Sequence, residues 1–556
     1  MREEGNNKRE YLLLLAILFI GVFFRVSNLD VIPAWHWDEG TNQNIAWNLA
    51  GGRLQWYCLT FPFVPHPPLF FIVVSLLFNV FSSEIIVMRY LCVFYGIASI
   101  PLIYWIGRRT GGGGIGLIAA FLFSIYPSAI YWNRMGFANN QLMLLILLTI
   151  YFSLRYMQEK KERWLYLASF STGLSLITEY TGIAVLISSM IFLWVYARKN
   201  LVKYVFISLI PFIVFVAVML YIMPSAFIHD ILFQLERYGI TADKLIIAVI
   251  FLAVLYSSRN YLMNLYAEMA YYMVSLDGKT GEETRRNRVK SNVMLFLFLM
   301  NFFLGLSTLI PLSDYIFIHY GDYLWFGFLG LFFITEKRRR NFILIYAIPL
   351  LLITWKIFRM DHMWIPLYPL FCIGMVYLLR AVYGFMLSLM SYRLSSLALL
   401  FILCYPLFFI MLNDVSSFIF GAGLKREDVG RYERVADYID QNTGEGDFIL
   451  TDPYIWSFSD TRSCSLLQGI VIEGVWMFYM APDYGFERFA FNCSYRNARF
   501  VVIEEYPTLY EYYEREEYSE RLEDIKREIT GWPHRYVEGY WIYRNPAHNN
   551  ADTISV

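Results

Sequence analysis

The sequence predicts an all-α polytopic membrane domain of about thirteen transmembrane helices, followed by a small exported α/β domain. Three observations predict this fold. The 556 residues are 58% hydrophobic and only 17% charged, whereas soluble chains are about 45–50% apolar and about 25% charged. Apolar runs close to membrane-spanning length recur from residue 11 to residue 412. After residue 413 the composition turns polar, so the predicted domains are 1–413 and 414–556.

Each predicted span is close to the ~20 residues that a bilayer requires, and this makes the lipid bilayer the first partner. A membrane β-barrel would instead alternate apolar and polar residues over segments of about ten. The spans are expected at 11–27, 85–107, 114–131, 139–157, 164–178, 182–197, 204–223, 245–263, 292–310, 321–336, 341–355, 364–382 and 394–412.

The basic residues predict the orientation of the chain. With the N-terminus in the cytoplasm, the basic clusters fall in cytoplasmic loops, as the positive-inside rule requires. These clusters are Arg108-Arg109; Lys160, Lys161 and Arg163; Arg198, Lys199 and Lys203; Arg285, Arg286, Arg288 and Lys290; and Lys337–Arg340. The formal net charge is zero, so the overall charge gives no reason to expect nucleic acid as a partner.

The apolar segment Leu69–Phe81 decides this topology. As a helix it reaches about 20 Å, which is less than the ~30 Å hydrocarbon core. We therefore expect it to lie at the outer interface, begun by Pro67-Pro68. Residues 28–84 then form one long outer loop, and the odd number of spans places the C-terminal domain outside as well. No organelle signal is apparent, which favours a plasma membrane.

The polar C-terminal region predicts a mixed α/β fold. Apolar residues recur at helical spacing over 426–441, and Gly444-Glu-Gly446 follows as a turn. Strands are expected near 447–451, 468–472, 499–504 and 539–543. Cys464 and Cys493 could form a disulfide if this region is exported, or remain free.

Two adjacent carboxylates follow the first span, in the run Trp35-His-Trp-Asp-Glu39. A helix is expected from Gly40 to Ala50, with Asp38 at its start. Asp38 is then either an N-cap or a carboxylate kept ionised at the helix N-terminus, and the two interpretations are compatible. An ionised carboxylate in this position can accept a proton from an attacking hydroxyl.

Other candidate residues fall in the same predicted outer layer. His66, before two prolines, is either a surface histidine or a donor to a phosphate. Arg134 follows the third span, where an arginine either extends to the headgroups or clamps a lipid phosphate. Arg89 lies about four residues into the second span, and the same outward extension would satisfy it.

Two further outer turns carry polar residues. Glu179 and Tyr180 lie between the fifth and sixth spans, and Arg359, Asp361 and His362 crowd the turn before Pro366. The second cluster is either a solvated loop or part of one site with Asp38.

No nucleotide-binding motif is present, and no Asp-x-Asp pair of the kind that binds nucleotide sugars. All the candidates face outward, where nucleotide-activated sugars are normally absent. A group transfer there needs a donor delivered through the membrane, and a lipid phosphate-linked sugar fits that need. Two adjacent carboxylates without further ligands make a poor metal site, so neither a metal nor a cofactor is expected.

Taken together, Trp37-Asp-Glu39 after the first span, His66-Pro-Pro-Leu69 and Arg134 resemble the motifs of a known family. It comprises the GT-C polytopic glycosyltransferases, which include protein O-mannosyltransferases and lipid A aminoarabinose transferases. The resemblance covers the topology of residues 11–412. It implies that Asp38 and Glu39 are the catalytic acidic pair and that the donor is a polyprenyl or dolichyl phosphate sugar.

The chain departs from this family at two positions. Many relatives carry an Asp near Asn139, and a Lys in the turn where this chain has Glu179 and Tyr180. We predict that these three residues contact the substrate. The Trp-Trp-Asp signature of oligosaccharyltransferases is absent, which argues against transfer of a whole glycan.

The sequence therefore predicts inverting transfer of one sugar to an acceptor hydroxyl of a protein, lipid or glycan. Asp38 is the expected general base, and Glu39 orders the loop or binds acceptor. The residues expected to bind the donor phosphate are Arg134, His66, His362 and Arg359. A lipid or solute transporter is the first alternative, and it predicts ionisable residues at mid-bilayer depth. A sensor or assembly protein that binds through its exported domain is the second.

Overall fold

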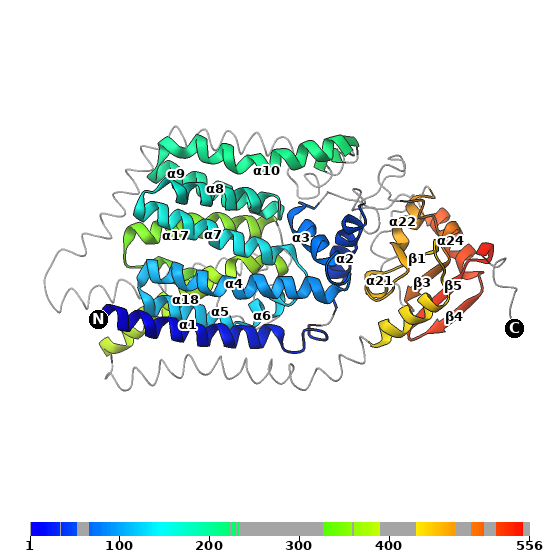
Figure 1. Ribbon diagram of the computed structural model, residues 1–556, viewed down its shortest axis with the longest axis horizontal. Coiled ribbons are helices and arrows are strands. Elements are labelled where there is room, and N and C mark those ends of the chain that lie inside the picture. Colours follow the sequence, from blue (N-terminus) through cyan, green and yellow to red (C-terminus); the bar gives the residue numbers. More distant parts are fainter. Residues whose placement is uncertain are drawn as a thin grey trace.

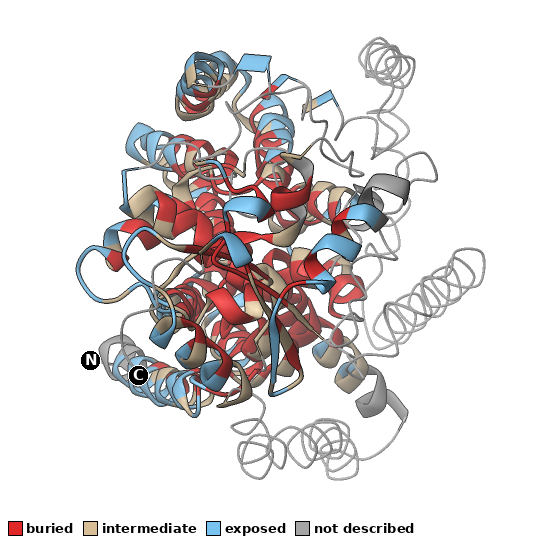
Figure 2. Ribbon diagram, turned by 90° about the vertical axis from the view of Figure 1, so that its right-hand side faces the viewer, coloured by how far each residue is buried: buried red, intermediate tan, exposed pale blue. Residues whose placement is uncertain are grey.

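The computed structural model describes residues 2–33, 35–52, 66–222, 326–357, 361–389, 430–473, 491–504 and 519–548, and a few residues between 224 and 232. The helices run side by side as a bundle, and a sheet formed by C-terminal residues lies beyond one end of it (Figure 1). Buried residues concentrate at the centre when the molecule is viewed from the side of the sheet (Figure 2).

The bundle helices are α1 (Arg2–Val26), α4 (Ile85–Gly111), α5 (Gly113–Ile125), α6 (Pro127–Asn133), α7 (Ala138–Glu159), α8 (Glu162–Leu176), α9 (Ile183–Tyr196), α10 (Leu201–Ile222), α16 (Phe326–Gly330), α17 (Lys337–Ile357) and α18 (Tyr368–Leu389). Large apolar side chains remain exposed on the outlying helices, such as Phe19 on α1 at 74% and Val202 on α10 at 80%. Apolar surface of this kind suits contact with lipid.

Four described helices are long and apolar enough to cross a membrane. They are Ile85–Gly111, Ala138–Glu159, Arg198–Ile222 and His362–Gly384, and α5 with α6 would make a fifth if the pair forms one span. The predicted spans 245–263, 292–310 and 394–412 lie outside the described residues. The total of about thirteen therefore stays a prediction.

The predicted span 114–131 corresponds to two helices, α5 and α6, which form one bent span or a re-entrant segment. The chain bends by 61° between α5 and α6, where Tyr126 and Pro127 follow one another. Pro127 has no N–H, so it cannot continue the hydrogen bonds of α5, and it occupies the first turn of a new helix instead.

The basic loops and the acidic pair lie at opposite ends of the bundle. Helix α4 carries Arg89 near its start and Arg108 near its end, which a helical rise places about 29 Å apart. Arg108 forms an ion pair with Glu10 of α1. The helices α2 (Trp37–Ala50) and α3 (Leu69–Phe78) lie at the other end, beside the sheet (Figure 1). Helix α3 is only about 15 Å long, which is too short to cross the ~30 Å hydrocarbon core of a bilayer.

The sheet contains β1 (Phe448–Thr451), β2 (Arg462–Ser465), β3 (Phe500–Glu504), β4 (His534–Val537) and β5 (Tyr540–Arg544) in the order β2-β1-β3-β5-β4. Strand β1 pairs in parallel with β2 and β3, whereas β5 is antiparallel to β3 and β4. Alternate residues of β1 enter two cores: Ile449 packs with the helical residues 430–441, and Leu450 packs with α24 (Ser519–Thr530). The sheet is therefore covered on both faces.

Three of the four predicted strands are present, as β1, β3 and β5, and helical structure covers the described part of 426–441. The strand expected at 468–472 is wrong, because α22 (Leu466–Val471) occupies it, capped by the Ser465 side chain accepting the Gln468 N–H. Strands β2 and β4 were not predicted. Cys464 and Cys493 are both buried and are not joined by a disulfide in the structure; the Cys464 thiol donates to the Gln468 side-chain oxygen at 3.2 Å.

Candidate functional site at the start of helix α2

Helix α2 begins earlier than the sequence predicts, and Asp38 is not its N-cap. The N-cap is His36, whose Nδ1 accepts the N–H of Asp38 at 3.1 Å. The Glu39 carboxylate accepts the N–H of His36 at 3.3 Å and completes a capping box. Asp38 therefore lies in the first helical turn, and the cap does not use its carboxylate.

Glu39 forms a buried bidentate ion pair with Arg89 of α4. Arg89 Nε lies 2.8 Å from Oε1 and Nη2 lies 2.6 Å from Oε2, and neither side chain is exposed. The Gly136 N–H donates to Glu39 at 2.8 Å. Arg89 also donates to the carbonyls of Leu29 and Pro33. The outward extension predicted for Arg89 is wrong, because Glu39 gives its guanidinium a buried partner. This arrangement fits the loop-ordering role among those predicted for Glu39.

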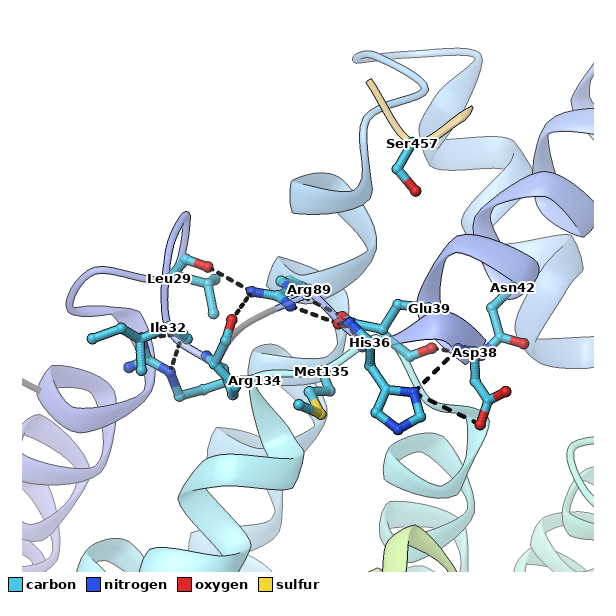
Figure 3. Close-up of polar contacts among 12 residues, drawn as sticks. Leu29, Ile32, His36, Asp38, Glu39, Asn42, Arg89, Arg134, Met135 and Ser457 are labelled. Carbon is cyan, nitrogen blue, oxygen red and sulfur yellow. Dashed lines mark hydrogen bonds and ion pairs between the residues drawn. The ribbon is translucent and has the colours of Figure 1, made fainter. Parts of the chain in front are cut away.

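Asp38 points away from this ion pair (Figure 3). Its side chain is 45% exposed, and one carboxylate oxygen lies 3.7 Å from His36 Nδ1. Burial raises the pKa of the Asp38 carboxyl, and the nearby Glu39 charge raises it further, while His36 opposes both. A carboxylate that is accessible and more basic than usual is suited to accept a proton.

The guanidinium of Arg134 donates hydrogen bonds to main-chain carbonyls. It donates to Phe24 at 2.7 Å, to Ser27 at 2.6 Å, and twice to Ile32 at 2.9 and 2.6 Å. These carbonyls belong to the end of α1 and the loop that follows it. Arg134 therefore fastens the loop that leads to α2, and the Figure 3 view shows it on the far side of Arg89 from Asp38.

Two of the predicted histidines lie close to the acidic loop. His362, at the start of η5 (Asp361–Leu367), stacks on Phe137 at 4.5 Å, and His36 contacts the same ring at 5.3 Å. His66 is close enough to influence His362 electrostatically. Burial lowers the pKa of His66 to about 4. His66 is therefore neutral at pH 7, when one ring nitrogen can still donate a hydrogen bond.

Glu179 lies in a buried turn beside His66. The Leu69 N–H donates to the Ile177 carbonyl at 2.8 Å, which joins the segment after His66 to the turn that carries Glu179. Glu179 is 8% exposed, and its carboxylate accepts the N–H of Tyr180 at 3.0 Å. Burial raises the pKa of Glu179 to about 7. This carboxyl is therefore half protonated near neutral pH.

Asn139 lies at the start of α7, next to the His362 segment. Its side-chain nitrogen contacts the Met363 sulfur at 3.4 Å. Arg359 and the side chain of Asp361 lie outside the described residues. Within the described ranges no group of three or more His, Cys, Asp or Glu residues could hold a metal ion, and the expectation of a metal-free reaction stays a prediction.

The sequence did not identify two residues that shape this site. His36 belongs to the quoted motif, but histidine is an uncommon N-cap, and only its spacing of three from Glu39 indicates a capping box. Arg89 was visible as a cation in an apolar span. The signal that Arg89 has an ion-pair partner was the presence of a carboxylate, Glu39, in the long loop before α4.

We expect the Glu39–Arg89 ion pair to dominate local stability. Glu39→Gln leaves a buried guanidinium without its counter-charge, which should lower the free energy of unfolding by about 3–5 kcal/mol. Thermal unfolding in detergent measures this loss. The matched control is Glu538→Gln, which removes a pair with Arg434 whose members are 40% and 52% exposed and should cost much less, because solvent screens exposed charges. Equal losses in the two variants would contradict the assignment.

Glu179 should make stability depend on pH. The folded carboxyl has a pKa of about 7 against an ordinary value of 4.5, so between these values the unfolded chain releases a proton that the folded chain keeps. Unfolding free energy should therefore fall as pH rises from 4.5 to 7, by about 3 kcal/mol at most. Glu179→Gln should remove this slope in thermal unfolding measured across that range. The exposed Glu84→Gln is the control, and an unchanged slope in Glu179→Gln would refute the expectation.

Comparisons with known proteins confirm the resemblance predicted from the sequence. A family profile described as dolichyl-phosphate-mannose-protein mannosyltransferase matches residues 65–224. This range includes His66, Arg134, Asn139, Glu179 and Tyr180 but not the acidic pair. Among curated protein sequences, none matches the chain.

Solved structures resemble the chain along most of its length. The Archaeoglobus fulgidus oligosaccharyltransferase AglB, in complex with an inhibitory peptide and a dolichol-phosphate, has a TM-score of 0.50 at 14% identity, covering 90% of this chain and 70% of its own. ArnT from Cupriavidus metallidurans, bound to undecaprenyl phosphate, has a TM-score of 0.47 at 12% identity, covering 98% of both chains. The chain thus resembles the membrane-bound GT-C glycosyltransferases in fold, and the profile match supports glycosyl transfer as the general activity.

Proposed function

We propose that the chain transfers one sugar from a polyprenyl (dolichyl-type) phosphate to an acceptor hydroxyl on the outer face of the plasma membrane. The observation that carries this proposal is the accessible Asp38 carboxylate beside the buried Glu39–Arg89 ion pair. The donor class is supported by the description of the matching family profile and by the dolichol-phosphate in the AglB complex. The acceptor belongs to a protein, a lipid or a glycan.

The proposed chemistry is a single displacement with Asp38 as general base. The acceptor oxygen forms a bond to the anomeric carbon while its proton passes to the Asp38 carboxylate. The bond between that carbon and the phosphate oxygen breaks, and its electron pair leaves with the lipid phosphate. Because attack and departure occur on opposite faces, the configuration of the sugar is inverted. The raised pKa of the accessible Asp38 carboxylate suits it to this task.

Charge that develops on the leaving phosphate requires hydrogen-bond donors, and we assign this role to His66 and His362. Both lie next to the acidic loop, and one preorganised donor contributes about 3–4 kcal/mol in such a role. Arg359 keeps its predicted phosphate role. Arg134 is reassigned, because its hydrogen bonds to carbonyls make it a positioning residue for the loop between α1 and α2.

Substrate contacts are proposed for the residues around the two histidines. Asn139 lies beside the His362 segment, and Glu179 lies beside the His66 segment, with Tyr180 adjacent. A carboxyl with a pKa of about 7 can donate or accept a hydrogen bond to a sugar hydroxyl, depending on its protonation.

The transporter alternative gains no specific support. Three arginines of the described bundle, Arg25, Arg89 and Arg134, are fully buried. Arg89 and Arg134 bind within the acidic-loop region, and Arg25 binds Asn133, which precedes Arg134. Their charges therefore hold one end of the bundle together and do not form the mid-depth pathway that a transporter needs.

Asp38→Asn should lower sugar transfer by about 10²–10⁴-fold, because the amide cannot take the proton. The assay incubates membranes containing the variant with radiolabelled dolichyl-phosphate mannose and other polyprenyl-phosphate sugars, and counts labelled product. Asp30→Asn, which changes an exposed carboxylate of the same loop, is the control and should retain activity. Full transfer by Asp38→Asn would remove Asp38 from the mechanism.

The proposal also fixes the side of the membrane on which α2 lies. In a cysteine-free background that retains transfer, Ser83→Cys should react with a membrane-impermeant maleimide in intact cells. Lys161→Cys should react only after the cells are opened, because the basic loops are proposed to be cytoplasmic. Both positions are exposed in the structure. The reverse pattern would place the acidic loop in the cytoplasm and defeat the proposal.

A further inference from the structure

The C-terminal segment packs directly against the helix that carries Asp38. The short helix α21 (Pro453–Trp456) follows β1 and lies against α2 in Figure 1. The indole N–H of Trp456 donates to the Gly40 carbonyl at 2.9 Å, and the bond is buried. Gly40 is two residues after Asp38, so this bond acts on the same helical turn.

The packing is too close for any side chain at position 40. A Cβ on Gly40 would lie 2.5 Å from the Pro453 carbonyl oxygen and 2.6 Å from the Pro453 Cβ. Backbone atoms cannot yield as a flexible side chain can. Glycine at this position is therefore what allows α21 to reach α2.

Aromatic contacts extend the interface to two tryptophans that precede Asp38 in the sequence. Tyr454 meets Trp37 edge-on at 5.9 Å, and Phe458 meets Trp35 edge-on at 5.0 Å. Tyr454 also stacks on Tyr432 at 5.3 Å, which ties α21 to the helical residues 430–441. Asp38 is close enough to Tyr454 to act on it electrostatically.

The start of α21 is itself held firmly. The Asp452 carboxylate accepts the N–H groups of Tyr454 and Ile455 at 2.9 and 3.2 Å, which caps the helix. Trp456 is 6% exposed and Ile455 is fully buried in the core of the C-terminal sheet. The contact with Gly40 is therefore made by a fixed element at the end of β1.

We infer that α21 is a clamp on the first turn of α2, and that Trp456 and Gly40 are positioning residues that keep the Asp38 carboxylate aligned for proton transfer. The inference rests on the proposed function. It makes the C-terminal segment part of the catalytic apparatus. The Glu39–Arg89 pair holds one side of this turn against the bundle, and α21 holds the other.

The test uses the full-length protein with radiolabelled dolichyl-phosphate mannose as donor and native membranes as the source of acceptor. Trp456→Phe removes the hydrogen bond while keeping an aromatic ring, and Gly40→Ala forces α21 away. Both should lower kcat by about 10-fold to 100-fold, since small misplacements of a catalytic group have effects of this size. Donor binding should be unchanged. The acidic limb of the pH–rate profile should move to lower pH as Asp38 becomes better solvated.

Two matched controls separate positioning from general damage. The first control is Gly51→Ala. Gly51 lies at the other end of α2, and a Cβ added there would be 3.6 Å from its nearest neighbouring atoms, an ordinary contact distance. Trp532→Phe changes a buried tryptophan in the other core of the C-terminal segment. Both should keep the wild-type rate and profile. Trp456→Phe keeps the test decisive if Gly40→Ala does not fold.

The outcomes separate this inference from the function on which it rests. Wild-type kcat and an unshifted acidic limb in Trp456→Phe, with Asp38→Asn inactive, would overturn the clamp and leave the proposed function standing. Retained transfer in Asp38→Asn would overturn both.

Discussion

The buried ion pair between Glu39 and Arg89 is the interaction on which the site depends. Removing two charges from water costs several kcal/mol for each ion, and only good geometry with further hydrogen bonds offsets that cost. Here both conditions hold. Arg89 donates twice to Glu39 and also to two loop carbonyls, while Glu39 accepts the Gly136 N–H as well. The pair therefore joins α4, α2, the loop before α2 and the turn between α6 and α7.

Helical geometry explains how two neighbouring carboxylates acquire different roles. Consecutive residues of a helix point about 100° apart, so a turn that directs Glu39 into the bundle directs Asp38 elsewhere. The N-terminus of α2 favours an ionised Asp38 by about 0.3–1 kcal/mol. Burial and the Glu39 charge act in the opposite direction and prevail, because the pKa of Asp38 is raised.

The sequence predicted features that follow from local pattern and missed those set by distant contacts. Apolar runs located most described helices, and β1, β3 and β5 lie where strands were expected. The identity of the acidic pair followed from its position after an apolar span. The partner of Glu39 did not follow, because Arg89 lies 50 residues away and only packing brings the two together. Strand β2 is polar and short, so its composition does not predict a strand. Its hydrogen-bonded pairing with β1 holds it in the extended conformation.

The same limit explains why Arg134 was predicted to bind phosphate. An arginine at the end of a helix looks the same in the sequence whether its side chain contacts lipid headgroups or main-chain carbonyls. In the structure the loop after α1 offers the carbonyls of Ser27 and Ile32 to Arg134 within hydrogen-bond distance. A planar guanidinium with five N–H groups satisfies several such acceptors at once. Tertiary folding of the loop thus brings these carbonyls to Arg134, and the neighbours of Arg134 in the sequence gave no indication of this.

His36 links helix capping to the chemistry of Asp38. Its Nδ1 accepts the Asp38 N–H, so this nitrogen carries no proton while the cap is intact. The same ring nitrogen lies 3.7 Å from the Asp38 carboxylate. The residue that caps α2 therefore also forms part of the surroundings of the proposed base, so capping and chemistry depend on one side chain.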